Sequence, residues 1–213
     1  MKLKKMISLA LAGIMAISML TACGGKGESN SGNTETPVAP AAGVSGKIQN
    51  LLDKGDLITL TDNATYQTYL SAAIEKAKLD GSNVNTDDGL LLVSTEVSSL
   101  FENNVVGYTD LTTLIQNPND FYKNNAIYSF VLSFEGDYSE DVILNGVAQS
   151  MNQLIAKGIL KSNVKITDGT DSYVYSCEYT GSVSMQKVTV EGNSAWYFLL
   201  TIAVDSNKTK VDA

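Results

Sequence analysis

The chain has 213 residues, of which 44% are apolar and 18% charged, a composition that predicts one globular domain of ordinary size with flanking segments. All 15 basic residues are lysines and histidine is absent, which excludes histidine-based catalysis, imidazole metal sites and guanidinium contacts to phosphate or carboxylate. The 23 acidic residues give a net charge of −8, and because an acidic surface repels a phosphate backbone, we expect no nucleic-acid partner.

Residues 1–22 have the features of a secretory signal peptide. Three lysines precede an uncharged stretch, residues 6–20, which is shorter than the roughly 20 residues that span a bilayer. The run Leu20-Thr21-Ala22-Cys23 follows, and it resembles the lipobox of bacterial lipoproteins. The resemblance implies that the Cys23 thiol receives a diacylglycerol and that cleavage before Cys23 removes the leader. We therefore expect a protein anchored to the extracytoplasmic face of the cell membrane through the lipid on Cys23.

Cys23 and residues 24–46 form a second segment, rich in Gly, Ser, Asn, Thr, Pro and Ala. Such a composition buries too little apolar surface to offset the entropy of ordering, so we expect a flexible linker with a span of about 25–30 Å. Beyond the leader, 12 lysines remain against 23 acids, a net charge of about −11. If Cys23 carries the lipid, Cys177 has no intramolecular partner, and the fold is expected to hold without a disulfide.

The folded domain is predicted to span residues 47–204 and to begin with helices. Residues 47–54 have the pattern of a short amphipathic helix. Thr61 or Asp62 is expected to cap the next helix, and Gly81 to end it.

A third segment starts at Thr86, which suits a helix N-cap. Helical spacing of its apolar residues favours a helix, but the run Leu90–Val93 also fits a strand, and the pattern leaves both open. Residues 104–125 are expected to be loop-like with short helical turns, since Asn117-Pro118-Asn119 interrupts them.

Residues 126–135 alternate between apolar and polar side chains and predict a half-buried strand. Ser139 is placed to cap the following helix, which is expected to run to about Lys157 and to stop at Gly158. The apolar stripe of that helix consists of Val142, Ile143, Val147, Met151, Leu154 and Ile155.

The last third is rich in predicted strands, at residues 163–167, 172–180, 183–191 and 195–204. Turn dipeptides at Asp168-Gly169, Gly181-Ser182 and Gly192-Asn193 separate them. Residues 205–213 are expected to be a frayed polar tail.

This order predicts an α+β fold, with N-terminal helices, one strand, a helix, and then an antiparallel β-meander packed against the helices. The arrangement resembles that of cystatin-like and nuclear-transport-factor-like domains. The resemblance implies a helix on a curved sheet, with a cone-shaped pocket between them. Fold alone does not imply function.

A row of tyrosines is the first candidate site. Tyr173, Tyr175 and Tyr179 share one strand face with Cys177, and together with Trp196 they are candidate ligand-binding residues, because aromatic rings stack on sugars and apolar ligands. The alternative is a core or cross-strand row. Cys177 lacks a histidine to activate it and is expected to be a buried thiol.

Three polar segments are candidate cation sites. Glu135, Asp137, Glu140 and Asp141 lie close together and either bind Ca²⁺ or form a solvated turn at a helix start. The segment from Asn83 to Gly89 faintly matches an EF-hand loop but has Ser94 where that motif needs Glu, so a loop and helix cap is expected. Asp168-Gly169-Thr170-Asp171 is expected to be a turn. We expect no metal and no cofactor.

No catalytic motif is present in the sequence, and no catalytic residue is assigned. We expect a non-catalytic binding or accessory domain for a small ligand, a glycan or an envelope protein. Two alternatives remain open: an envelope hydrolase that uses a pair of carboxylates, and a structural or folding-assistance lipoprotein.

Overall fold

The computed structural model describes residues 43–109, 119, 122–123, 125–156 and 158–211. Cys23, the predicted leader and nearly all of the predicted linker lie outside these residues, as does most of the loop expected at residues 104–125. The described part is an α+β fold, as the sequence predicted. None of its helices is long and apolar enough to cross a membrane.

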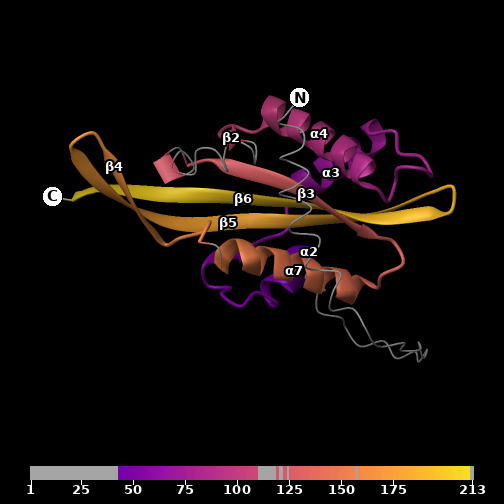
Figure 1. The fold of residues 1–213 in the computed structure, drawn as a ribbon, viewed down its shortest axis with the longest axis horizontal. Helices are drawn as coiled ribbons and strands as arrows, with labels where there is room; N and C mark the ends of the chain where they lie inside the picture. Colours follow the sequence, from indigo (N-terminus) through magenta and orange to yellow (C-terminus); the bar gives the residue numbers. More distant parts are fainter. Residues whose placement is uncertain (1–42, 110–118, 120–121, 124, 157, 212–213) are drawn as a thin grey trace.

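Four helices and six strands make up the described part of the chain (Figure 1). The helices are α2 (Val44–Gln49), α3 (Ala64–Lys76), α4 (Asp87–Asn104) and α7 (Glu140–Ala156). The strands are β1 (Ile58–Leu60), β2 (Tyr108–Thr109), β3 (Ile127–Glu135), β4 (Asn163–Asp168), β5 (Asp171–Val190) and β6 (Asn193–Val211).

The long hairpin of β5 and β6 forms the central part of a mixed six-stranded sheet (Figure 1). The sheet order is β1-β5-β6-β3-β2. Strand β6 is antiparallel to both β5 and β3, whereas the short edge strands β1 and β2 are parallel to β5 and β3, respectively. The strand β4 pairs with the N-terminal part of β5, so β4 and β1 follow one another along the same edge.

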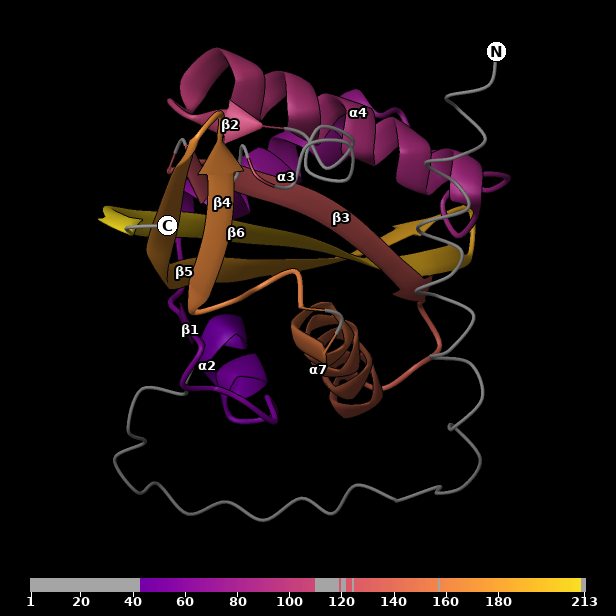
Figure 2. The ribbon, with the colours of Figure 1, turned by 60° about the vertical axis from the view of Figure 1, so that its left-hand side comes forward.

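Helices cover both faces of the sheet (Figure 2). One core cluster joins the sheet to α2 and α7, and a second joins it to α3 and α4. The strand predicted at residues 126–135 is present as β3, but it is buried on both faces rather than on one. Tyr128 and Leu132 face the first cluster, whereas Val131 is buried in the second.

The predicted turn at Gly181-Ser182 is also wrong, because β5 runs through it without a break. A Cβ atom on Gly181 would lie 2.4 Å from the carbonyl oxygen of Thr201, so the glycine permits a close approach of strands rather than a turn. The other two dipeptides do lie at hairpin turns, where Gly169 and Gly192 adopt φ values of +64° and +86°.

The tail predicted from residue 205 is ordered strand as far as Val211. Residues 205–211 pair with β5 over Ser172–Glu178. Lysine side chains support this pairing: the Lys208 ammonium lies 3.7 Å from the ring centre of Tyr173, and Lys210 lies 2.8 Å from a carboxylate oxygen of Asp171. Backbone pairing with β5 thus orders a segment whose polarity predicted fraying.

The helix boundaries differ in detail from the prediction. Asn63, rather than Thr61 or Asp62, caps α3, and its side chain accepts from the backbone N–H groups of Thr65 and Tyr66. The helix ends at Lys76, and Lys78 rather than Gly81 adopts the left-handed conformation, with φ +50°.

The start of α4 and the end of α7 were predicted correctly. Thr86 caps α4, and residues 90–93 are helical, which settles the alternative left open above. Gly158 follows α7 at φ +69° and donates to the Ile155 carbonyl. Val142 is exposed instead of joining the apolar stripe of α7, and Leu144 and Ala148 are buried.

The first helix lies earlier than predicted, because α2 begins at Val44 and ends at Gln49. The Gln49 amide accepts from the Leu60 N–H at 2.7 Å and donates to the Gly55 carbonyl at 2.7 Å. This side chain therefore organises the turn between α2 and β1, where the sequence predicted further helix.

Side chains occupy the edge of β5 beyond β1. The Ser45 hydroxyl accepts from the Val183 N–H at 2.9 Å, and the Gln67 amide both accepts from and donates to the Met185 backbone, at 3.2 and 3.3 Å. These helix side chains take the place of a further strand and satisfy backbone groups of β5.

Candidate functional site

The tyrosine row is mostly part of the core. Tyr175 and Tyr179 are buried in the cluster beneath α2 and α7, while Tyr173 is half-buried under the Lys208 ammonium. The Tyr179 hydroxyl donates to the Lys161 carbonyl at 2.8 Å and accepts from the Lys161 N–H at 3.0 Å. Burial raises the pKa of the Tyr179 phenol well above its ordinary value, so the group stays neutral.

Trp196 lies on the same face of the sheet but far from the tyrosines. It pairs with Lys187 across the hairpin, whereas Tyr179 pairs with Val204. Eight positions of β5 separate Tyr179 from Lys187, a distance of about 26 Å at about 3.3 Å per residue. The structure therefore does not bring the four candidate residues together in one site.

The face between Tyr179 and Trp196 is filled by side chains. Val183, Phe198, Leu200 and Ile202 are buried there and belong to the same core cluster as the apolar face of α7. The sheet and α7 therefore pack directly on one another in the region where the resemblance to cystatin-like domains implied a cone-shaped pocket.

Cys177 is a buried free thiol, as predicted. Its sulfur lies 3.6 Å from the Tyr175 carbonyl. Burial raises the pKa of the Cys177 thiol, and a hydrogen bond with Tyr179 lowers it by less. Because the thiolate is the reactive form, this environment suits a packing role.

The acidic clusters have local partners. Glu140 forms an ion pair with Lys47 at 2.7 Å. In the segment that faintly matched an EF-hand loop, Thr86 caps α4. Just before that segment, Asp80 accepts hydrogen bonds from the backbone and hydroxyl of Ser82, which lower the Asp80 pKa. Within the described residues, no group of three or more His, Cys, Asp or Glu side chains is placed to hold a metal ion.

An open groove of about 480 Å³ lies between the outer face of α7 and the turn that follows α2. Figures 1 and 2 show α2 and α7 side by side on the same face of the sheet. The residues that line the groove are Leu51, Asp53, Asn145, Ala148, Gln149, Asn152, Gln153 and Ala156.

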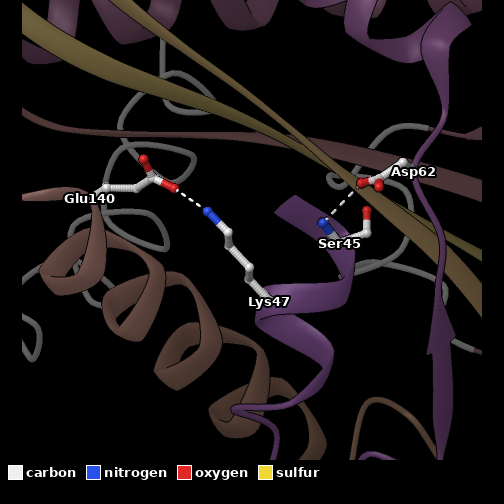
Figure 3. Close-up of polar contacts among 4 residues, drawn as sticks. All are labelled: Ser45, Lys47, Asp62 and Glu140. Carbon is white, nitrogen blue, oxygen red and sulfur yellow. Dashed lines mark hydrogen bonds and ion pairs between the residues drawn. The ribbon is translucent and has the colours of Figure 1, made fainter. Parts of the chain in front are cut away.

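Asn152 fixes the two walls of the groove to one another. Its Oδ1 accepts from the Asp53 N–H at 3.0 Å, and its Nδ2 donates to the Leu51 carbonyl at 3.5 Å. Further contacts hold α2 in place (Figure 3): Lys47 reaches Glu140 on α7, and the Ser45 N–H donates to Asp62 at 3.0 Å. The groove is thus formed by segments about a hundred residues apart in the chain.

The remaining amides of the groove keep hydrogen-bonding capacity. The Gln153 Oε1 atom is buried and has no hydrogen-bond partner among the described residues. Asn145 uses its Nδ2 to donate to the Asp141 carbonyl at 2.8 Å, and Gln149 is exposed. These side chains present both donors and acceptors, which is the property of a surface that recognises a polar, uncharged ligand.

Sequence reasoning did not identify this groove. Asn145, Gln149 and Asn152 recur at helical spacing along one side of α7, and that is the one signal that was available. Polar side chains at this spacing are also the ordinary composition of a solvated helix face, so the pattern alone does not mark a site.

Comparisons with protein-family models, curated proteins and solved structures found no match to this chain.

Proposed function

We propose that the protein is a lipid-anchored, extracytoplasmic binding protein without catalytic activity, and that it holds its ligand in the groove between α7 and the turn after α2. The observation that carries the binding role is the set of amide side chains along the groove, one of which buries an acceptor that no described group satisfies. The location rests on the signal peptide and lipobox of residues 1–23.

The chemistry of the lining favours binding over hydrolysis. Glycosidases need two carboxyl groups, about 5–9.5 Å apart across the scissile bond. The lining of this groove contains one carboxylate, Asp53, among amides and small apolar side chains. A ligand in this groove meets hydrogen-bonding groups but no acid–base pair.

The arrangement of exposed apolar side chains gives a folding-assistance role less support. Among the described residues, the exposed large apolar side chains fall into two groups. Leu91 and Leu92 on α4 and Val106 just after it form one group, and Leu51 after α2, Tyr138 before α7 and Val142 in α7 form the other. Helices α4 and α7 lie on opposite faces of the sheet (Figure 2), so the exposed groups do not combine into the contiguous patch that such a role requires.

Metabolic labelling with radioactive palmitate tests the anchoring. We expect the full chain and a Cys177→Ala variant to be labelled, and a Cys23→Ala variant to be unlabelled and released from the membrane. Cys177→Ala is a matched control because it removes the other thiol of the chain. Label that persists in the Cys23→Ala protein, or no label in the wild type, would refute the proposal.

Co-sedimentation tests the binding. Full-length Cys23→Ala protein, which lacks the lipid, is mixed with envelope fragments that have been washed free of lipid with detergent. We expect it to sediment with the fragments, and expect a further Gln149→Ala substitution in the groove to reduce the bound fraction. Sedimentation that is absent, or that the substitution leaves unchanged, contradicts a role for the groove.

A further inference from the structure

We infer that the ligand of the groove is a neutral glycan chain that carries acetamido and hydroxyl groups. This inference rests on the proposed function, in which the groove between α7 and the turn after α2 is a ligand site. The charge, the hydrogen-bonding groups and the length of the lining support it.

The charge of the groove favours an uncharged ligand. Among the described residues that line the groove, Asp53 is the single charged one and none is a lysine. The N-terminus of α7, at Glu140, is occupied by acidic side chains and lies about a turn before the first lining residue, Asn145. A phosphate or carboxylate ligand would therefore meet a carboxylate without a compensating cation.

The hydrogen-bonding groups match hydroxyl and acetamido groups. Each Asn or Gln amide offers a carbonyl acceptor and two N–H donors, and sugar hydroxyls and acetamido groups likewise both donate and accept. The Gln153 Oε1 atom needs a donor, and Gln149 offers both kinds of group at the open surface. A ligand with paired donors and acceptors can hydrogen-bond with the exposed Gln149 amide.

The length and floor of the groove suit a chain rather than a single sugar. Asn145, Gln149, Asn152 and Ala156 follow one another along α7, and at about 1.5 Å per residue this row spans about 16 Å. Ala156 is exposed and has a small side chain, which allows a flat ring to approach the helix there.

A peptide ligand fits these observations less well. Peptides are recognised through a sheet edge, a wide apolar groove, an aromatic-lined groove or a cluster of basic residues. One wall of this groove is a helix, whose interior backbone groups are already paired within the helix. Of the lining residues that the structure describes, Leu51 is the one large apolar side chain that is exposed, and none is aromatic or basic.

Isothermal titration calorimetry with full-length Cys23→Ala protein and a hexamer of N-acetylglucosamine tests the inference. We expect saturable binding, weakened about tenfold by Gln149→Ala and by Gln153→Ala, as loss of about one hydrogen bond predicts. Gln149 is exposed, so its variant keeps the fold. Asn103→Ala is the matched control: this α4 amide donates to the Ser99 carbonyl of its own helix, and its loss should leave binding unchanged.

Three outcomes would overturn the inference. They are no saturable binding of the hexamer, binding that Gln149→Ala does not weaken, and tighter groove-dependent binding of either the deacetylated hexamer or an uncharged peptide of similar length. The protein could still sediment with envelope fragments, in an amount that Gln149→Ala reduces, while the hexamer does not bind. In that case the inference of a glycan ligand is wrong and the proposed binding function stands. If neither binds, both fail.

Discussion

Ser45 is expected to hold α2, and with it one wall of the groove, more firmly than the ion pair on the same helix does. The Ser45 side chain is completely buried. Its hydroxyl accepts from the Val183 N–H at 2.9 Å and lies 3.4 Å from the Val183 carbonyl oxygen, to which it donates. The Ser45→Ala substitution removes both contacts while leaving the backbone bond to Asp62, drawn in Figure 3, in place.

The expected cost follows from the groups that lose their partner. Val183 lies on the edge of β5 beyond β1, where no described strand can pair with it, so alanine leaves a buried N–H and a buried carbonyl unsatisfied. An orphaned buried group costs about 1–3 kcal/mol, and we expect a loss of about 2 kcal/mol in the free energy of unfolding. For a domain of this size the loss lowers the melting temperature by about 4–8 °C.

Lys47→Ala is the matched comparison on the same helix. The Lys47 and Glu140 side chains are 45% and 41% exposed, and exposed ion pairs contribute little to stability, so we expect no measurable change. Urea denaturation and calorimetry of the two full-length variants measure the difference. If Ser45→Ala is as stable as the wild type, or if Lys47→Ala is the more damaging change, the account of how α2 is held is wrong.

Two further predictions concern the face of the sheet covered by α3 and α4. Replacing Gly with Ala usually stabilises a helix, but Gly89→Ala should destabilise the protein by about 1–3 kcal/mol. The reason is that the new Cβ atom would lie 2.1 Å from the backbone oxygen of Asn83. A variant that proves more stable than the wild type in urea denaturation would contradict this prediction. Burial raises the pKa of Tyr197 to about 12 from its ordinary value of 10, and its hydroxyl donates to the Val84 carbonyl at 2.7 Å. Because the unfolded chain releases this proton first, the contribution of Tyr197 to stability is complete below pH 10. It falls by up to about 2.7 kcal/mol as the pH rises through 12. Unfolding free energies at pH 9 and 11.5 should therefore decline less in Tyr197→Phe than in the wild type, and equal declines would count against the argument.

Local patterns in the sequence predicted much of the fold. The cap at Thr86, the stop at Gly158 and the turns at Gly169 and Gly192 depend on a few neighbouring residues, and the structure has them where they were expected. Gly181 has the same local signal as the other turn glycines. Its role depends on the carbonyl of Thr201, a neighbour that only the strand pairing supplies.

Features that depend on distant partners were not predictable in this way. The polar residues 205–211 lack the apolar pattern of a strand, and they are ordered because β5 extends far enough to pair with them. The burial of β3 on both faces likewise depends on α3 and α4 covering the side opposite α7. The sequence pattern shows that Ser129 and Ser133 are polar, but not what covers them.

The candidate site likewise depends on contacts between distant parts of the chain. Tyr175 and Tyr179 were predicted either to bind a ligand or to pack in the core, and the structure places them in the core. The sequence did not predict the groove because its two walls meet through a long-range contact. This contact is the hydrogen bond between Asp53 and Asn152, which lie 99 residues apart in the chain. An amide row on a helix becomes a candidate site only when a second segment is known to face it.

The position of α2 connects the predicted anchor with the proposed binding site. The described fold begins at Gly43, directly before α2, and the turn that forms the groove wall follows α2 at Leu51 and Asp53. In the anchored protein, tension on the linker would therefore act first on the helix that supports this wall. A buried hydrogen bond from Ser45 to the central hairpin resists such displacement, whereas an exposed ion pair exchanges readily with water. The loss of Ser45 should consequently weaken ligand binding as well as stability, although Ser45 does not line the groove.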